Sequence, residues 1–150
     1  MDLRLARDYE DLLFLYTTRR HPLVAIMLSG KAPESIQQHT DYINKVQEKS
    51  KWIFIASSDE KNIGYGQIYD VTEEQLEVGF VIHPDFQGKG FGKKLVNSIV
   101  SKAKELFPNR KIILYVKKEN FKAIHIYEKC GFVSCGDKED TLFMELKGNV

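Results

Sequence analysis

The chain has 150 residues and a formal net charge of +1, and 43% of its residues are hydrophobic and 29% charged. These values are ordinary for a globular domain and exclude a disordered or fibrous protein. No run approaches the roughly 18 consecutive apolar residues of a membrane span, and the opening Met1-Asp2-Leu3-Arg4 is not an apolar leader, so we expect one cytoplasmic domain over residues 1–150.

The first fifty residues predict one short strand and two helices. Leu3 to Leu5 alternates like a strand. A helix is expected from Tyr9 to Arg19, with Asp8 as its N-cap and His21-Pro22 as its stop. A second helix is expected from Pro33 to Lys49, where apolar residues recur at three- and four-residue steps and the proline suits the first turn.

Three β-rich runs follow. Trp52 to Ala56 and Ile63 to Tyr69 are separated by a polar turn and predict a hairpin. Leu76 to Ile82 continues the antiparallel pattern as a third strand. Gly79 interrupts that run and is consistent with a β-bulge.

The remaining chain alternates helices and strands. The expected elements are a long helix from Gly92 to Leu106 closed by Pro108, a strand from Ile112 to Val116, a helix from Phe121 to Cys130 capped by Asn120 and ended by Gly131, and closing strands at Phe132-Val133 and Thr141 to Leu146. The order β-α-α-β-β-β-α-β-α-β-β describes a mixed α/β domain.

Positive charge is concentrated in one part of this nearly neutral chain. Residues 86–122 contain ten Lys or Arg and only two acids. Such a segment predicts one site for a polyanionic ligand rather than a general nucleic-acid surface, although a solvated basic face would give the same composition.

A glycine loop lies within this basic segment, between a strand and the long helix. Its sequence is Gln87-Gly88-Lys89-Gly90-Phe91-Gly92, and Lys93 and Lys94 follow in the first helical turn. A helix start presents unpaired N–H groups and glycines let the backbone approach closely, so the loop suits a pyrophosphate. A P-loop is disfavoured because Lys94 stands in place of Ser/Thr, and a dinucleotide fingerprint because Gly92 comes one residue too early.

The loop matches the pattern Gln/Arg-x-x-Gly-x-Gly/Ala, and residues 120–132 match Asn-x-x-Ala-x-x-x-Tyr-x-x-x-Gly-Phe. On these two blocks, with Val81-Ile82-His83-Pro84 before the first, the sequence resembles the GNAT superfamily of acetyl-CoA-dependent N-acetyltransferases over most of residues 50–146. The resemblance implies an α/β (α+β) GNAT fold: a mixed, mostly antiparallel sheet of six to seven strands, flanked by about four helices, with a splay between the fourth and fifth strands.

The same resemblance implies acetyl-CoA as the acetyl donor and no metal. Coenzyme A would lie in the splay, with its pantetheine amides on the strand backbone that precedes the loop and its pyrophosphate on residues 87–93. The cofactor-binding residues implied in this way are Phe80, Val81, Ile82, Gln87, Gly88, Lys89, Gly90, Phe91, Gly92, Lys93, Asn120, Ala123 and Tyr127.

Two residues are candidates for moving protons. Tyr127 stands where the family's thiolate-protonating tyrosine falls, and a phenol with a pKa near ~10 can protonate a departing thiolate. The alternative is a core aromatic on the apolar stripe of its helix. Glu77 is the candidate base for the acceptor amine, and the alternative is an ordinary solvent-facing strand residue.

Other chemistry is less well supported by the sequence. The histidines His21, His39, His83 and His125 show no metal-ligand spacing, and His39 is either an acceptor contact or a half-buried helix residue. The two cysteines are too few for a disulfide framework. Cys130 has no His/Asp partner placed by sequence, so direct acetyl transfer is favoured over a covalent cysteine intermediate.

The acceptor is expected to be the primary amine of a small molecule, such as an amino sugar or another amine metabolite. Arg19-Arg20, Met27, His39 to Ile43 and Trp52 to Phe54 faintly resemble acetyltransferases that modify nucleotide-linked amino sugars. One alternative is a ribosomal-protein-type N-terminal acetyltransferase, although Tyr115 stands where those enzymes often have Glu. Another is a non-catalytic acyl-CoA-binding module. We expect no nucleic-acid or membrane partner, and a monomer or homodimer.

Overall fold

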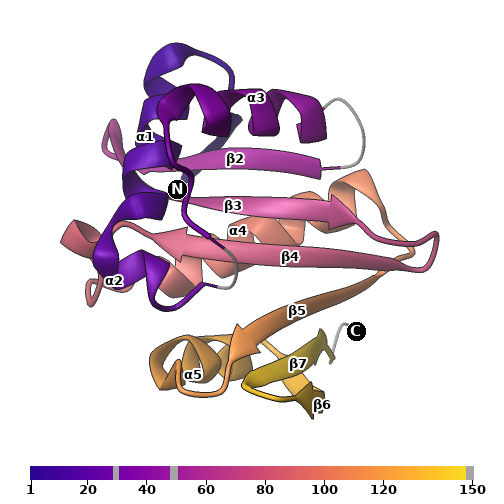
Figure 1. Cartoon of the computed structure of the whole chain (residues 1–150). Coiled ribbons are helices and arrows are strands. Elements are labelled where there is room, and N and C mark those ends of the chain that lie inside the picture. Colours follow the sequence, from indigo (N-terminus) through magenta and orange to yellow (C-terminus); the bar gives the residue numbers. More distant parts are fainter. Residues whose placement is uncertain (29–30, 48–50, 148–150) are drawn as a thin grey trace.

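A computed structural model of the chain describes residues 1–28, 31–47 and 51–147. These residues form one seven-stranded sheet with the strand order β1-β2-β3-β4-β5-β7-β6 (Figure 1). The elements are β1 (Asp2–Leu5), α1 (Tyr9–Arg20), α2 (Pro22–Ala25), α3 (Ile36–Gln47), β2 (Lys51–Ser58), β3 (Lys61–Asp70), β4 (Gln75–Ile82), a short 3-10 turn (Pro84–Phe86), α4 (Phe91–Leu106), β5 (Lys111–Lys117), α5 (Phe121–Lys129), β6 (Phe132–Lys138) and β7 (Thr141–Leu146).

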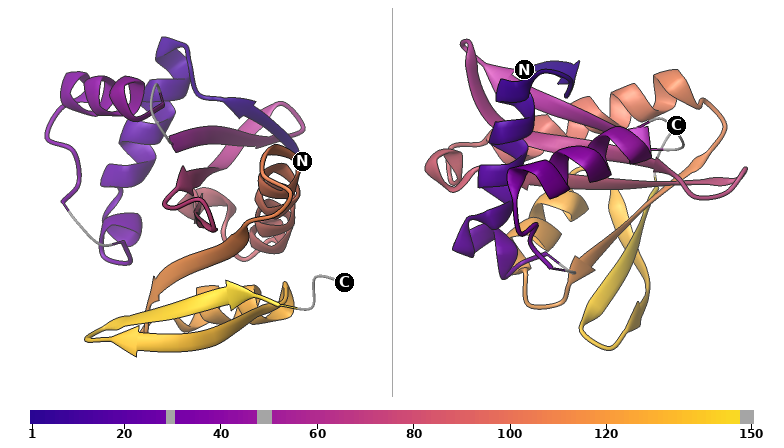
Figure 2. Two further views of the ribbon diagram at one scale, coloured as in Figure 1. Left: turned by 90° about the vertical axis from the view of Figure 1, so that its right-hand side faces the viewer. Right: turned by 45° about the horizontal axis from the view of Figure 1, so that its top comes forward.

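The helices cover the two faces of the sheet with separate apolar cores. On one face, α1 and α3 pack on β2 and β3 through Leu12, Leu15, Ile43, Ile53, Ile55 and Tyr65. On the other face, the apolar stripe of α4 packs on β3, β4 and β5 and is extended by α5. The left view of Figure 2 shows α1 and α3 on one side of the central strands and α4 on the other. None of the helices in the described ranges has both the length and the apolar content needed to cross a membrane.

The N-terminal helices start and stop for local reasons. Asp8 caps α1 as predicted, because its side chain accepts a hydrogen bond from the Asp11 N–H at 2.8 Å. The short helix α2 was not predicted from the sequence. His21-Pro22 ends α1 but also begins α2, since the His21 Nδ1 accepts from the Leu23 N–H at 3.2 Å and proline suits the first helical position.

The predicted start of the next helix was wrong. α3 begins at Ile36 rather than Pro33, because Ser35 caps it: the Ser35 hydroxyl accepts from the Gln38 N–H at 3.1 Å. Pro33 therefore lies in the connection before the helix rather than in its first turn. The last two residues of the predicted helix, Glu48 and Lys49, lie outside the described residues.

The predicted hairpin of β2 and β3 is confirmed, with Ser58 opposite Lys61. The two turn residues, Asp59 and Glu60, have positive φ angles of 50° and 65°. Two consecutive positive φ angles in a two-residue loop match the turn geometry that fits the twist of paired strands. The sequence lacks the Asn-Gly or Asp-Gly signal usual for this turn.

The predicted splay between the fourth and fifth strands is confirmed. β4 and β5 are parallel neighbours only from Gln75↔Lys111 to Glu77↔Ile113. Beyond that point β5 diverges from β4 and pairs with β7 instead, as Figure 1 shows.

The bulge expected at Gly79 was wrong. The pairing of β3 with β4 runs without a register shift through Gln67↔Gly79. The glycine instead leaves room for a side chain of β3, since a Cβ at position 79 would lie 2.7 Å from the Gln67 Nε2 atom. Gly79 therefore marks a position where the Gln67 side chain of β3 lies close to the β4 backbone.

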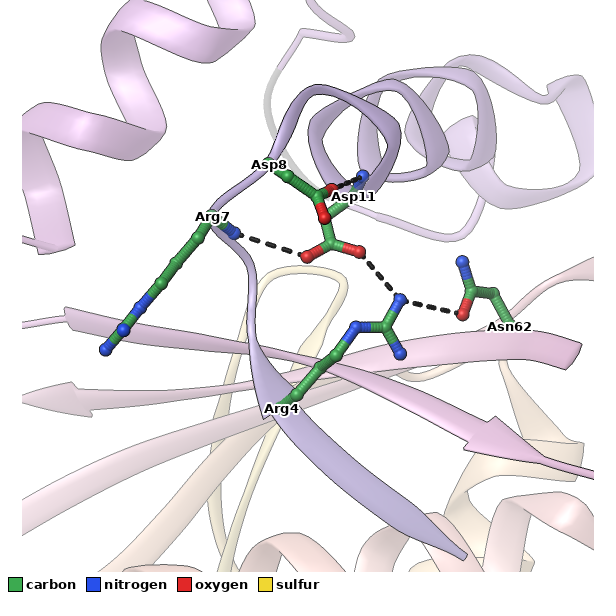
Figure 3. Close-up of polar contacts among 5 residues, drawn as sticks. All are labelled: Arg4, Arg7, Asp8, Asp11 and Asn62. Atoms are coloured by element: carbon green, nitrogen blue, oxygen red, sulfur yellow. Dashed lines mark hydrogen bonds and ion pairs between the residues drawn. The ribbon is translucent and has the colours of Figure 1, made fainter. Parts of the chain in front are cut away.

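A buried carboxylate fixes the start of α1 against the sheet. Asp11 is 3% exposed, its Oδ1 accepts from Arg4 Nη2 at 2.7 Å and its Oδ2 accepts from the Arg7 N–H at 3.4 Å. Arg4 Nη2 also donates to Asn62 Oδ1 at 3.0 Å. Figure 3 shows that these contacts join β1, the first turn of α1 and the β2-β3 hairpin. Because α1 forms one wall of the cleft described below, this network also positions that wall.

Replacing Asp11 by alanine should lower the free energy of unfolding by about 2–3 kcal/mol, because a guanidinium group and an N–H group lose a buried acceptor. Urea denaturation measures this loss. Asp137→Ala is the matched control, since it removes the exposed ion pair with Lys118 and should cost less than about 1 kcal/mol. Equal losses in the two variants would contradict the structural role given to Asp11.

Candidate active site

A cleft of about 680 Å³ opens where β4 and β5 diverge. Its walls come from both faces of the sheet. Residues that line it include Arg19, His39 and Tyr42 from α1 and α3, Glu77, Gly79 and Phe80 from β4, Tyr115 from β5, and Asn120 and Tyr127 from the start and middle of the α5 region. A ligand in this cleft would therefore contact both layers of helices through the gap in the sheet.

The glycine loop forms the turn into α4 on one side of the splay. Gly88 and Gly90 have φ angles of 75° and 84°, and a Cβ at either position would meet no atom within 4 Å. Gly90 is the N-cap of α4 and provides no side-chain capping hydrogen bond. The first-turn N–H groups therefore lack a side-chain cap at the positive end of the helix dipole, and the loop is open at both glycine Cβ positions.

The surroundings of this loop also fit a diphosphate. Gln87 Nε2 donates to the Ile82 carbonyl at 3.0 Å, which ties the loop to the end of β4. The ammonium groups of Lys89 and Lys94 lie 5.7 and 5.9 Å from the ring centres of Phe86 and Phe91. The loop thus combines open backbone donors with positive side chains, as an anion site at a helix start requires.

Gly92 has a different role from the other loop glycines. A Cβ at this position would lie 2.9 Å from Ile126 Cδ1, so the glycine permits the close packing of α4 on α5. This packing places the second predicted block, on α5, beside the first. Asn120 caps α5, because its Oδ1 accepts from the Ala123 N–H at 3.4 Å.

The edge of β4 that faces the splay suits an extended ligand. After Glu77 this edge has no strand partner among the described residues, because β5 has turned to β7. Phe80 and Val81 line the cleft, whereas Ile82 is not among its lining residues and instead accepts the Gln87 hydrogen bond. Amide groups of a bound chain could pair with this edge as an added strand would.

Tyr127 lies on the α4 face of the sheet. Its ring centre is 5.5 Å from that of Phe80 and 6.1 Å from that of Phe132. Burial raises the pKa of the phenol above its ordinary value, and Cys130 adds to the effect. The side chain therefore stays protonated at neutral pH. It packs with the core and also lines the cleft, so the two interpretations of this tyrosine are compatible.

Glu77 reaches the cleft from the opposite face. Its neighbours along β4, Leu76 and Val78, are buried in the core under α4, so alternation turns Glu77 toward the α1 and α3 side. Burial raises the pKa of this carboxyl, and the positive charge of Lys51 opposes the shift. The structure thus brings Glu77 and Tyr127 to one cleft from opposite sides of the sheet.

His39 and Cys130 have different relations to the cleft. His39 lines it, and burial, followed by the charges of Arg19 and Lys51, lowers its pKa to about 4. Cys130 is not among the lining residues, and burial raises the pKa of its thiol. A reactive thiolate is therefore not favoured at Cys130. Within the described ranges, no group of three or more His, Cys, Asp or Glu is placed to hold a metal ion.

Several lining residues were not predicted from the sequence. They include Lys51, Tyr42 and Lys117. The Lys51 ammonium lies 5.6 Å from the Tyr42 ring centre and 5.9 Å from that of Tyr69. Lys117 Nζ donates to the Ile26 carbonyl at 3.0 Å and so joins β5 to the segment after α2. These contacts depend on strand register and long-range packing, for which a single sequence contains no local signal.

The comparison with known families identifies the chain. The family model described as acetyltransferase (GNAT) family matches residues 14–132, so the chain belongs to the GNAT acetyltransferase family. Spermidine N(1)-acetyltransferase of Vibrio cholerae is 28% identical, over 93% of this chain and 83% of that protein. Acetyltransferase PseH of Campylobacter jejuni is 27% identical, over 92% of this chain and 87% of that protein.

Solved structures show the same fold. The V. cholerae spermidine N-acetyltransferase in complex with CoA and spermine superposes with a TM-score of 0.83 at 24% identity, covering 96% of this chain and 92% of that one. C. jejuni PseH in complex with acetyl coenzyme A superposes with a TM-score of 0.76 at 22% identity, covering 99% of this chain and 100% of that one. The predicted family, fold and acetyl donor are confirmed: the protein is an acetyl-CoA-dependent N-acetyltransferase.

The lowered pKa of His39 predicts a specific pH dependence of stability. Between pH 6.5 and about 4 the unfolded chain binds a proton on His39 that the folded protein excludes, so the free energy of unfolding should fall as the pH is lowered through this range. Because the imidazole is only half-buried and solvent screens part of the effect, the loss should be on the order of 1–2 kcal/mol below pH 4. Urea titrations of the wild type and of His39→Gln over this range measure the His39 contribution, as the difference between their pH dependences of the free energy of unfolding. Parallel curves would contradict the buried, neutral imidazole.

Proposed function

We propose that the enzyme acetylates the primary amine of a small molecule by direct transfer, with Glu77 as the base and Tyr127 as the acid. The observation that carries this proposal is that both side chains line one cleft from opposite faces of the sheet, at the point where β4 and β5 separate. A relative that is named a spermidine acetyltransferase supports a small amine as the acceptor.

On the donor side, the backbone and lysines of residues 87–93 bind the diphosphate, and the β4 edge at Phe80 and Val81 pairs with the pantetheine amides. Asn120 and Ala123 shape the start of α5 beside this path. When bound, acetyl-CoA supplies a thioester carbonyl as the electrophile. The protein's part is to hold that carbonyl at the splay, between its base and its acid.

Glu77 provides the route for the amine's proton. An amine attacks only when it is neutral, and a carboxylate on the acceptor face can take the proton directly or through water. Burial raises the pKa of Glu77, which makes the carboxylate a stronger base than an exposed glutamate. Lys51 opposes this shift, because its positive charge favours the carboxylate form of Glu77.

Tyr127 provides the proton for the departing sulfur. The phenol is protonated at working pH, and no described residue forms a hydrogen bond with its hydroxyl, which leaves the O–H available to a ligand in the cleft. The apolar surroundings that raise the pKa of Tyr127 raise the basicity of a buried thiolate as well, because both anions lose solvation. The pKa values of the phenol and of the leaving thiol therefore shift in the same direction, so proton transfer from Tyr127 to the sulfur stays feasible.

The activity test is thiol release from acetyl-CoA in the presence of a panel of small amines and of peptides with free N-termini, with mass spectrometry of the products. Release with small amines alone supports the proposal. Release with peptides alone would make the enzyme a protein N-terminal acetyltransferase, and cofactor binding without release from any acceptor would indicate a binding module. A cytoplasmic location, a monomeric or homodimeric state and the absence of a nucleic-acid partner stay predictions.

The placement of the diphosphate predicts different effects for two nearly isosteric substitutions. Asn and Asp both tolerate the left-handed conformation of Gly90, but only Asp places a negative charge beside the diphosphate. Gly90→Asp should weaken acetyl-CoA binding about 10²-fold more than Gly90→Asn, as measured by calorimetric titration. Similar affinities of the two variants would place the diphosphate elsewhere.

The two proton-transfer roles predict a loss of turnover without a loss of cofactor binding. Tyr127→Phe and Glu77→Gln should each lower kcat about 10²-fold while the Kd for acetyl-CoA stays within about twofold. Tyr9→Phe removes an exposed hydroxyl on α1 and serves as the control, with unchanged kcat. If Tyr127→Phe weakened acetyl-CoA binding as much as it slowed turnover, its role would be structural.

A further inference from the structure

The acceptor side of the cleft carries more positive than negative charge. Among the described residues, the lining cations are Arg19, Lys31, Lys51 and Lys117, and the lining carboxylates are Glu34 and Glu77. His39 of α3 also lines the cleft and is neutral at physiological pH, because its pKa is about 4. An acceptor with several positive charges would meet net repulsion there, whereas one with a negative group would be attracted.

Lys51 is held in place by aromatic rings rather than by a carboxylate. Its ammonium lies between Tyr42 of α3 and Tyr69 of β3, 5.6 and 5.9 Å from the two ring centres. No carboxylate of the described residues lies within ion-pair distance of it. Such packing orients the ammonium and leaves its hydrogen-bond donors for a ligand.

The sheet register fixes the distance from Lys51 to the base. Lys51 is opposite Tyr69, and Tyr69 is opposite Glu77, so the three residues cross β2, β3 and β4 in one row on one face. Since neighbouring strands lie 4.7–4.9 Å apart, the Cα atoms of Lys51 and Glu77 are about 10 Å apart. This separation matches a small molecule that carries an amine at one end and a charged group at the other.

Arg19 adds a second positive group to the same region. It lies on α1 and lines the cleft, and its charge acts together with that of Lys51 on His39. Cations from α1 and β2 thus converge on one part of the cleft from two different elements. A guanidinium and an ammonium around a small polar space form a suitable site for a phosphate or a carboxylate.

We propose that the acceptor is a primary amine that also carries an oxyanion, either phosphate or carboxylate, which Arg19 and Lys51 bind while the amine lies at Glu77. This inference rests on the proposed function and specifies its substrate class. In the reaction one N–C bond forms and one C–S bond breaks. The amine's proton leaves through Glu77, and the sulfur receives the Tyr127 proton.

The same charges disfavour a polyamine acceptor in this chain. A polyamine would place additional ammonium groups near Lys51 and Arg19, and among the residues that the structure describes Glu34 and Glu77 are the carboxylates that line the cleft to offset them. Acidic residues further out on the rim would have to compensate across solvent, where charges interact weakly. The structure therefore separates this protein's acceptor from that named for its spermidine-acetylating relatives.

The test compares kcat/KM for matched acceptors. D-glucosamine 6-phosphate is paired with D-glucosamine, 4-aminobutyrate with butylamine, and spermidine is the polycation. We expect at least a tenfold preference for the anionic member in one pair or both, which also tells phosphate from carboxylate, and the lowest value for spermidine. Equal values within both pairs, or a preference for spermidine, would overturn the proposal.

Three charge-removing variants test which residues produce the preference for anionic acceptors. Lys51→Gln and Arg19→Gln should each lower the ratio of kcat/KM between the anionic acceptor and its partner without the anion at least tenfold. Taking this ratio cancels any effect that loss of the Lys51 charge has on the pKa of Glu77, since that effect is common to both acceptors. Lys61→Gln removes an exposed charge at the start of β3 and is the matched control, with no change. Either of the first two variants suffices if the other fails to fold. Equal losses on acceptors with and without the anionic group would contradict oxyanion binding.

A binding measurement separates this proposal from the proposed function. The protein saturated with CoA is titrated calorimetrically with D-glucosamine 6-phosphate and with 4-aminobutyrate. Binding that Lys51→Gln weakens, without acetylation of any amine, would reject the proposed function and retain the oxyanion site. Acetylation of amines that lack an anionic group, with no binding preference for the anionic acceptors, would retain the function and reject the site.

Discussion

The cleft exists because the parallel pairing of β4 with β5 ends at Glu77 and Ile113. β5 keeps its hydrogen bonds beyond that point because β7 becomes its partner, whereas β4 keeps only β3. An unpaired strand edge inside a sheet is costly unless water or a ligand satisfies its polar groups. The edge is therefore suited to a ligand that presents amides at strand-like spacing, and the gap lets one ligand reach both faces.

The two faces at this gap offer different chemistry. The start of α4 and the body of α5 give the donor face open N–H groups and a protonated phenol. On the acceptor face, α1, α3 and the first residue of β2 surround Glu77 with cations and aromatic rings. The Arg4–Asp11 contact matters to this second face, because it fixes where α1 begins relative to the sheet.

The elements that carry the proposed donor site were predictable from sequence because their signals are local. The glycine loop and the 120–132 block each lie within a dozen or so residues, and the helix caps Asp8 and Asn120 acted as predicted. Errors arose where one residue type has two uses. Pro22 ends one helix and begins another, and Gly79 accommodates the Gln67 side chain rather than a bulge. The row that joins Lys51 to Glu77 depends on the register of three strands, and no local pattern specifies it.

The same division explains why a shared fold does not identify the acceptor. The core under α1 and α3 is apolar and built from residues such as Leu15 and Ile43, which face the sheet. Arg19, Lys51 and Tyr42 lie at the margin of that core, so they can change with little effect on the packing that produces a TM-score of 0.83 at 24% identity. Substrate preference can therefore diverge between relatives while the donor site and the splay remain the same. The charge of the acceptor side in each chain is then a more direct guide to its substrate than the overall similarity of the folds.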